Sequence, residues 1–191
     1  TVGAGFIGSS LALSLLSKKH KITVLDNLSE QIHGPNAVLD SSLFQKIKDK
    51  VVFIKGDVCN EEDWKKVLPN QDVIVHLAAE TGTGQSMYLI KQYTDVNIGG
   101  TSLMLDLLSK YSYNVQKVVV ASSRAIYGEG RYLAPNGSFV YPGSRSRDNL
   151  SLGFFDCEFK GERNLQLVST DEESKIHPTS VYGITKQVQE Q

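Results

Sequence analysis

The amino-acid sequence predicts an α/β protein built around a doubly wound parallel sheet. Short runs of β-branched residues alternate with helical segments as far as Ala121. These runs are almost entirely apolar, which is typical of strands that are buried on both faces of a parallel sheet. The strand, helix, strand order implies right-handed crossover connections between neighbouring parallel strands.

Local patterns justify each predicted element in chain order. The apolar runs place strands at Ile22–Leu25, Val51–Ile54, Val73–Leu77 and Val118–Val120. Apolar spacing and polar ends place helices at Phe6–Lys18, Glu61–Leu68, Gln85–Tyr93, Asn97–Lys110 and Val181–Gln191. Asn60 can cap the second of these helices, and acidic residues in its first turn suit the helix dipole. The third and fourth helices are expected to form one longer segment that is broken near Gly99 and Gly100.

The segment 129–175 departs from this rhythm. Glycine and proline punctuate it, arginines occur along it, and its periodicity is poor. It is expected to be a long insertion with little regular structure. A solvated surface loop and a functional or mobile loop both fit this composition, since long loops in compact domains are usually functional or mobile.

Composition excludes several classes of protein. The 191 residues carry 20 Lys plus Arg against 21 Asp plus Glu, a net charge of -1, so a nucleic-acid-binding role is not expected. Apolar residues make up 40% of the chain, which allows a core, and no apolar run is long enough for a membrane span. Cys59 and Cys157 lie far apart, so neither a metal site nor a disulfide framework is indicated. The sequence therefore predicts a cytoplasmic protein with no metal and no membrane partner.

A glycine motif lies at the start of the first predicted helix. The segment Gly3-Ala4-Gly5-Phe6-Ile7-Gly8 fits the pattern G-x-G-x-x-G, whose glycines let backbone N–H groups approach a pyrophosphate at the helix N-terminus. Asp26 follows the first apolar run, 18 residues after Gly8, where a carboxylate can bind ribose hydroxyls. Because an acid would repel a 2′-phosphate, the pattern favours NAD over NADP. A tight turn that serves packing alone is the alternative.

Two further residues follow or lie within apolar runs. Asp57 comes after the second predicted strand, at the sheet edge where open α/β sheets bind ligands. It could meet an adenine edge or could begin the following helix. His76 lies inside an apolar strand and is expected to be a hydrogen-bonded core histidine.

Tyr182 and Lys186 form the strongest catalytic pattern. At positions i and i+4 of a helix their side chains share one face, so the ammonium can favour the ionised form of the phenol. An ordinary phenol loses its proton near pH 10, so a base that works near neutrality needs nearby positive charge. Ser123 ends the last predicted strand, at the ligand-binding edge of the sheet. An exposed Tyr–Lys pair with no chemical role is the alternative.

Seven segments together resemble one enzyme family. They are GAGFIGS at 3–9, VLDNLS at 24–29, GDV at 56–58, HLAA at 76–79, DVNIGGT at 95–101, SSRAIYG at 122–128 and SVYGITKQVQEQ at 180–191. In this order they resemble the extended short-chain dehydrogenase/reductase superfamily, in its NAD-dependent nucleotide-sugar epimerase/dehydratase branch. Residues 27–34, 78–88 and 121–130 further resemble bacterial sugar-nucleotide 4-epimerases. One position departs from the family pattern T-G-x-x-G-x-x-G, because Val2 follows Thr1.

The resemblance implies a Rossmann-like fold and assigns roles to matching positions. Tyr182 would be the general acid and base, Lys186 would assist it and hold the nicotinamide ribose, and Ser123 would share the proton transfer. Asp26 and Asn27 would hold the adenosine ribose. The full set of implied cofactor positions is Gly3, Gly5, Phe6, Ile7, Gly8, Asp26, Asn27, Asp57, Val58, Leu77, Ala78, Ala79, Asn97, Tyr182 and Lys186. Implied substrate positions are Thr83, Ser86, Ser123 and Arg124.

The implied reaction is 4-epimerisation of a dTDP- or UDP-sugar through a 4-keto intermediate, with NAD as the cofactor. A 4,6-dehydratase is the nearest alternative, but Arg124 follows Ser123 where that reaction needs an acidic pair. Another NAD-dependent sugar-nucleotide oxidoreductase and a catalytically silent NAD-binding protein are further alternatives.

The resemblance also carries expectations about boundaries and assembly. Residues 1–191 would form a cofactor domain cut at both ends, without its first strand and without the C-terminal sugar-binding region. A homodimer is expected, because family members pair through two helices. Residues that could serve the core or the dimer contact are Met87, Leu89, Ile90, Leu103, Leu107 and Leu108.

Overall fold

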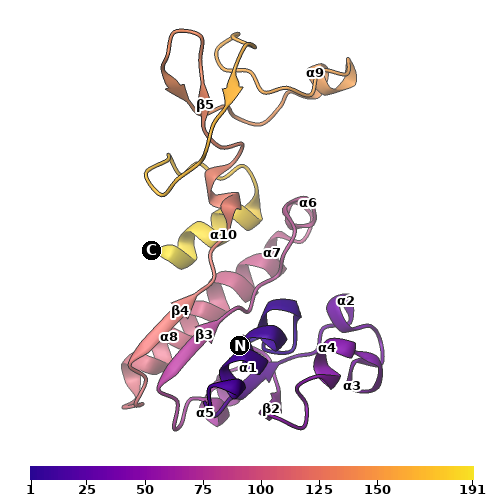
Figure 1. Ribbon diagram of the computed structural model, residues 1–191, viewed down its shortest axis with the longest axis vertical. Helices are drawn as coiled ribbons and strands as arrows, with labels where there is room; N and C mark the ends of the chain where they lie inside the picture. The colour runs from indigo at the N-terminus through magenta and orange to yellow at the C-terminus, as the bar shows by residue number, and fades with distance from the viewer. The chain divides into compact units, whose positions relative to one another are not determined.

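The computed structural model describes all 191 residues, which form two compact units (Figure 1). The first unit comprises Thr1–Glu80 and Thr94–Ala121. The second unit comprises Thr81–Tyr93 and Ser122–Gln191. Each unit draws on two separate stretches of the chain, so neither corresponds to a simple N- or C-terminal half.

Four parallel strands form the centre of the first unit. Strand β1 (Thr23–Asp26) pairs with β2 (Val52–Lys55), and β3 (Val73–His76) pairs with β4 (Lys117–Val120). All four predicted strands are confirmed, with ends that differ by one residue at most. The β-branched runs that predicted them supply the core, as expected for strands covered by helices.

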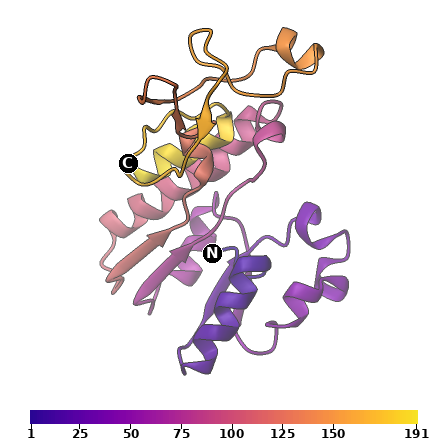
Figure 2. The ribbon, with the colours of Figure 1, turned by 45° about the horizontal axis from the view of Figure 1, so that its top comes forward.

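Alternate residues of the strands bury against helices on opposite faces. Val24 belongs to one apolar cluster, which includes residues of α1 (Phe6–Ser17) and α4 (Ser42–Gln45). Leu25 belongs to a second cluster, which includes residues of α5 (Glu61–Val67) and α8 (Gly100–Lys110). Figure 2 shows α8 alongside the β3–β4 pair. Because consecutive strand residues point to opposite faces, this division is that of a doubly wound sheet and confirms the predicted fold class.

The two strand pairs face each other across a gap in the first unit. Strands β1 and β3 are not hydrogen-bonded to each other. The backbone N–H of Val2 donates to the Leu25 carbonyl at 2.8 Å, and the Thr1 amine donates to the Val75 carbonyl at 2.8 Å. A cavity of about 110 Å³, lined by residues of β1, β3 and α1, lies beside these contacts. The predicted sheet is therefore present as two parallel pairs, and Val2 and Thr1 each hydrogen-bond to one of them.

The helices of the first unit follow the predicted positions with two differences. Asn60 caps α5 as predicted, since its side-chain oxygen accepts from the Glu62 N–H at 2.9 Å. The expected break near Gly99 is a change of helix type, from the π-helix η1 (Thr94–Gly99) to α8. Three short helices between β1 and β2 were not predicted: α2 (Glu30–His33), α3 (Ala37–Asp40) and α4. Four residues form barely one helical turn, so these segments have no apolar periodicity to read.

Helix α10 (Val181–Glu190) organises the second unit. It contacts α6 (Thr83–Ser86), α7 (Ile90–Tyr93) and the 3₁₀ helix η2 (Arg124–Tyr127). Ser180 begins α10 because its hydroxyl accepts from the Gly183 N–H at 3.0 Å. None of the helices of the chain is both long enough and apolar enough to span a membrane.

The segment 129–175 has more structure than predicted. It contains the three-stranded antiparallel sheet β6–β5–β7 and the helix α9, with bounds β5 (Tyr132–Leu133), β6 (Phe139–Val140), β7 (Gln166–Leu167) and α9 (Arg147–Ser151). Arg131 fixes this sheet by donating to the Ser169 carbonyl at 3.0 Å and to Asp171 at 2.8 Å. A strand of two residues is too short to show an alternation of apolar and polar side chains. The sequence therefore gave no signal for these strands.

Candidate functional site

The glycine motif forms a close-packed turn at the N-terminus of α1. A Cβ atom added at Gly8 would lie 2.2 Å from the Val2 carbonyl oxygen, and one at Gly3 would lie 2.6 Å from the Val24 side chain. Gly5 is the N-cap and brings no capping side chain, while Phe6 and Ile7 are exposed. The first-turn N–H groups of α1 thus remain available, and the helix dipole favours an anion there. This geometry fits the pyrophosphate of a dinucleotide.

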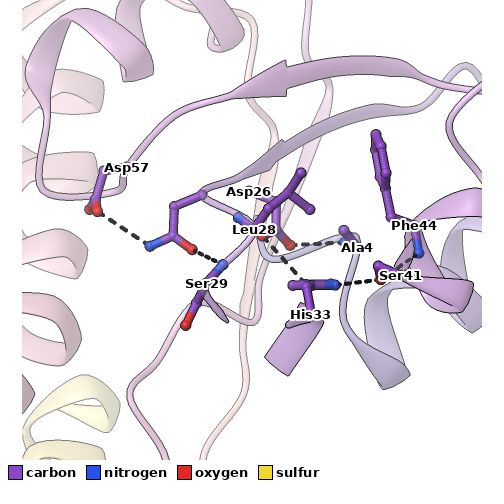
Figure 3. A network of polar contacts seen from close by, with 9 residues as sticks. Ala4, Asp26, Leu28, Ser29, His33, Ser41, Phe44 and Asp57 are labelled. Carbon is purple, nitrogen blue, oxygen red and sulfur yellow. Dashed lines mark hydrogen bonds and ion pairs between the residues drawn. The ribbon is translucent and has the colours of Figure 1, made fainter. Parts of the chain in front are cut away.

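Asp26 lies at the end of β1, as predicted, but its carboxylate is turned inward. One oxygen accepts from the Ala4 N–H at 3.0 Å and the other from the Leu28 N–H at 2.8 Å (Figure 3). His33 lies 3.9 Å from the carboxylate and contacts Ser41 at 2.7 Å. Asp26 is 3% exposed. The carboxylate of Asp26 therefore holds the glycine turn against β1. A ribose hydroxyl that binds here would donate to an oxygen that already accepts a backbone hydrogen bond.

Asn27 and Asp57 connect the ends of neighbouring strands. The Asn27 amide donates to an Asp57 carboxylate oxygen at 3.4 Å, and its own oxygen accepts from the Ser29 N–H at 3.1 Å. The other Asp57 oxygen accepts from the Cys59 N–H at 2.8 Å, which forms the turn before α5. Asp57 therefore forms a turn before the helix, while Asn60 rather than Asp57 caps α5, so the capping alternative is wrong. Asn27 is exposed beside it, whereas Val58 is buried in the core.

The segment after β3 is fixed by buried polar contacts. His76 is a buried, hydrogen-bonded core histidine, as predicted, with ring nitrogens 2.8 Å from the Thr1 hydroxyl and 3.1 Å from the Thr101 hydroxyl. Asn97 is fully buried, and its amide pairs with both the N–H and the carbonyl of Glu80. Leu77 and Ala79 are partly accessible, whereas Ala78 is buried. Asn97 thus positions the loop that follows Ala79, so its implied cofactor role is indirect in this structure.

The predicted catalytic residues come together in the second unit. Tyr182 and Lys186 lie on α10, with the ammonium nitrogen 6.0 Å from the centre of the phenol ring. Ser123 immediately precedes η2, and its hydroxyl oxygen accepts from the Ala125 N–H at 3.1 Å. A Cβ added at Gly183 would lie 2.6 Å from the Ala125 carbonyl oxygen, so only glycine allows η2 to approach α10 this closely. That contact packs η2, which directly follows Ser123, against the helix that carries Tyr182 and Lys186.

Burial changes the chemistry of Lys186. Only 3% of this residue is exposed, and burial lowers the pKa of its ammonium group from 10.5 to about 8. Low polarity disfavours the charged form of an amine, which accounts for the direction of this change. With a pKa of about 8 the amine is still mostly protonated at neutral pH, so it can carry the positive charge that its expected role beside the phenol needs.

Tyr93 is a positioning residue that the sequence did not reveal. It is fully buried, and its ring packs edge-on against Tyr182 at a centroid distance of 6.3 Å. Its hydroxyl donates to the Thr81 carbonyl and lies 3.2 Å from the Gln85 side-chain oxygen. Tyr93 therefore fixes one face of the Tyr182 ring. Its place at the end of a predicted helix was visible in the sequence, but its partner, 89 positions further along, was not.

The implied substrate residues divide into accessible and buried side chains. Thr83 and Arg124 are exposed. Ser86 is fully buried and donates its hydroxyl to the Thr83 carbonyl at 2.6 Å, within α6. The hydroxyl of Ser86 is therefore held by the helical turn, and its contact with the sugar stays a prediction. No cluster of metal-binding side chains is present.

The site residues thus fall into two groups, one in each unit. The first unit contains the predicted cofactor residues other than Tyr182 and Lys186, namely the glycine turn, Asp26, Asn27, Asp57, Val58, Leu77, Ala78, Ala79 and Asn97. The second unit contains the predicted catalytic and substrate residues, namely Thr83, Ser86, Ser123, Arg124, Tyr182 and Lys186. The fold and the order of these residues along the chain define a dinucleotide-binding α/β protein of the extended short-chain dehydrogenase/reductase class.

Comparison with known proteins identifies the family. Residues 2–146 match the family described as NAD dependent epimerase/dehydratase, and the chain belongs to that family. NAD is the cofactor that the family description names. The resemblance seen in the sequence is thereby confirmed.

Two curated relatives illustrate the similarity. A dTDP-L-rhamnose 4-epimerase of Burkholderia thailandensis is 38% identical over 192 residues, which cover 100% of this chain and 50% of that protein. The bifunctional protein GAL10 of Candida maltosa is 31% identical over 144 residues, which cover 74% of this chain and 91% of that protein. The chain therefore spans half the length of the first relative.

Solved structures share the fold. A UDP-glucose 4-epimerase of Thermotoga maritima, solved with UDP-glucose, matches with a TM-score of 0.67 at 25% identity over 98% of this chain and 47% of its own. A UDP-glucuronic acid 4-epimerase of Bacillus cereus, solved with NAD, matches with a TM-score of 0.66 at 25% identity over 98% of this chain and 48% of its own. The chain spans less than half of each of these proteins.

Proposed function

We propose that the protein is a nucleotide-sugar 4-epimerase that acts by transient NAD-dependent oxidation at C4 of the sugar. The observation that carries this proposal is the arrangement around α10. Tyr182 and Lys186 lie on this helix, and the close contact between Gly183 and Ala125 brings Ser123 to the same helix. A phenol, an amine and a hydroxyl in this arrangement suit proton transfer to and from a sugar hydroxyl.

The residues of the chain divide the proton transfer among them. The Tyr182 oxygen takes the proton of the C4 hydroxyl and later returns it to the C4 oxygen. Ser123 hydrogen-bonds the same sugar oxygen, and the Lys186 ammonium stabilises the Tyr182 phenolate. Bound NAD would supply the redox chemistry, by taking a hydride from C4 and returning it to the opposite face of the 4-keto sugar. The residues proposed to hold NAD are the glycine turn, Asp26 and Asn27 in the first unit and Lys186 at the nicotinamide ribose.

The substrate is proposed to be a dTDP- or UDP-sugar. Support comes from the names of the relatives, which include a dTDP-L-rhamnose 4-epimerase and UDP-glucose 4-epimerases. A 4,6-dehydratase is disfavoured because Arg124, which is basic, follows Ser123 where dehydration requires carboxylates that act at C5 and C6. The exchange of one hydride and one proton at C4 needs no such pair.

The assembly and location are proposed on separate grounds. Met87, Leu89 and Ile90 are exposed apolar residues that suit a homodimer contact, whereas Leu107 is buried in the core of the first unit. Both cysteines are free thiols, which fits the reducing cytoplasm.

Replacement of Tyr182 by Phe tests the proposed function. In the intact protein, with NAD and a panel of dTDP- and UDP-sugars, Tyr182→Phe is expected to abolish turnover while NAD binding remains. Tyr88→Phe is a matched control, because Tyr88 lies in the same unit and is 87% exposed. Product analysis of each sugar nucleotide identifies the epimer. Wild-type turnover by Tyr182→Phe, or bound NAD without any turnover by the wild type, would overturn the proposal.

A further inference from the structure

A buried imidazole lies beside the Asp26 carboxylate in the first unit. The side chains of His33 and Asp26 are 1% and 2% exposed, and Nε2 of His33 lies 3.9 Å from Oδ1 of Asp26. This distance is longer than a hydrogen bond, so the contact is electrostatic. An imidazole buried away from water needs polar partners for its two ring nitrogens. His33 has these partners in Asp26 and Ser41.

The short helix α2 sets the position of His33. The His33 N–H donates to the Ser29 carbonyl at 2.9 Å, and the Gly34 N–H donates to the Glu30 carbonyl at 2.9 Å. Gly34 has a φ of 76°, a conformation that favours glycine, and the helix ends directly before it. His33 is therefore the last residue of α2, and its ring contacts the residue that ends β1.

Ser41 decides which ring nitrogen of His33 carries the hydrogen. The Ser41 hydroxyl oxygen lies 2.7 Å from Nδ1 of His33, and it accepts from the Phe44 N–H at 3.3 Å as the N-cap of α4. Because the hydroxyl can donate its own hydrogen to Nδ1, the hydrogen of a neutral ring stays on Nε2. Nε2 then presents an N–H to the Asp26 carboxylate, and a protonated ring would present the same N–H. The other neutral tautomer would place a lone pair against the negative charge.

The Asp26 carboxylate is therefore held at three points (Figure 3). Oδ2 accepts from the Ala4 N–H of the glycine turn, and Oδ1 accepts from the Leu28 N–H. Leu28 has a φ of 54°, which is uncommon for a bulky side chain, so the chain adopts an unfavourable conformation where it supplies this N–H. His33 adds the third contact, to Oδ1. Together the three contacts fix the direction in which the oxygen lone pairs point.

We propose that His33, supported by Ser41, is a positioning residue of the NAD site that directs the Asp26 carboxylate toward the adenosine ribose. This inference rests on the ribose contact that the proposed function gives to Asp26, and it extends the site to α2 and α4. A carboxylate that is oriented before binding accepts a ribose hydroxyl at a lower entropic cost than one that the ligand must order. His33 is itself buried, so it acts through Asp26.

Two forms of the cofactor separate positioning from general stability. The probes are NAD and its analogue without the adenosine 2′-hydroxyl, and the readout is the ratio of their Kd values from calorimetry on the intact protein. The wild type is expected to bind the analogue about tenfold more weakly than NAD, because a hydrogen bond to a charged group is lost. In His33→Leu this ratio should fall below about threefold, since NAD loses affinity while the analogue changes little. A structural defect alone would weaken both ligands alike and leave the ratio unchanged.

Three more variants complete the experiment. His33→Gln keeps a side-chain N–H for the Asp26 carboxylate and is expected to retain the wild-type ratio. Ser41→Ala removes the partner of Nδ1 and should lower the ratio, so it decides the question if His33→Leu does not fold. His20→Ala is the matched control, because His20 is an exposed histidine of the same unit, and its ratio is expected to equal that of the wild type.

The outcomes distinguish this inference from the proposed function. A wild-type ratio in His33→Leu, or in Ser41→Ala where the former does not fold, would overturn the inference. A ratio near one in a wild type that binds NAD would remove the ribose contact of Asp26 and the inference with it, and would leave the proposed reaction to the Tyr182→Phe experiment. A wild type that binds neither form of the cofactor would overturn both.

Discussion

Replacing Asp26 by Asn removes a buried charge while keeping the shape of the side chain. In the wild type both carboxylate oxygens accept backbone N–H groups, from Ala4 at 3.0 Å and from Leu28 at 2.8 Å. Asparagine has a single acceptor oxygen, so its NH₂ group must face one of the two N–H donors. One hydrogen bond is therefore lost, and one backbone N–H is left without a partner in a site that is 3% exposed.

The magnitude follows from these two bonds. A hydrogen bond to a charged group contributes about 1.5–3 kcal/mol, and a buried donor without a partner costs about 1–3 kcal/mol. Because the two figures partly describe the same loss, the expected decrease in the free energy of unfolding is about 2–4 kcal/mol. With a urea dependence of about 2 kcal/mol per M, the unfolding midpoint of the first unit should fall by about 1–2 M.

Fluorescence of Trp64 measures this change directly. It is the only tryptophan of the chain, it is 1% exposed, and it lies in the core of the same unit as Asp26. Asp40→Asn is the matched control, since Asp40 is an exposed carboxylate in that unit. A midpoint for Asp26→Asn equal to that of the control would refute the reasoning. A loss of NAD affinity at unchanged stability would show that the carboxylate serves the ribose alone.

Two further predictions concern Lys186 and Val2. The pKa of Lys186 in the folded protein is about 8, below its ordinary value of 10.5. Between these two pH values the unfolded chain binds the proton and the folded protein does not, so the free energy of unfolding should rise with pH by up to about 3 kcal/mol. Urea unfolding followed by circular dichroism should show this rise in the wild type and not in Lys186→Met; parallel pH profiles would contradict it. Val2 has a φ of 48°, a left-handed conformation in which a side chain costs about 1–2 kcal/mol. Glycine avoids this cost but loses about 0.5–1 kcal/mol more conformational entropy on folding, so Val2→Gly should be more stable than Val2→Ala by about 0.5–1 kcal/mol. The reverse order in thermal unfolding would show that the turn is not strained.

Elements that depend on neighbouring residues were predicted well. The strand β2 and the Asn60 cap of α5 follow from a few consecutive side chains, and both are confirmed. The common helix of Tyr182 and Lys186 was also accessible, because the two residues are four positions apart in an apolar-patterned segment. In each case the interaction that matters is encoded within about one turn or one strand.

Roles that depend on distant partners were not predictable in the same way. Tyr93 gains its role only through contact with Tyr182. A sequence pattern specifies which groups are present, whereas the direction in which a side chain points is decided by the packing around it.

Asp26 shows how these two levels meet in one residue. The sequence indicates a carboxylate for ribose hydroxyls, and the structure gives the same carboxylate the task of fixing the glycine turn through Ala4. A ligand that binds only the folded state stabilises it in proportion to its affinity. If Asp26 holds both the turn and the ribose, Asp26→Asn must lower the stability of the cofactor-free protein and also reduce the additional stability that NAD provides. The two effects are separable by measuring the unfolding midpoint, from Trp64 fluorescence, with and without NAD. If Asp26→Asn causes both effects, the same carboxylate that holds the glycine turn also binds the cofactor.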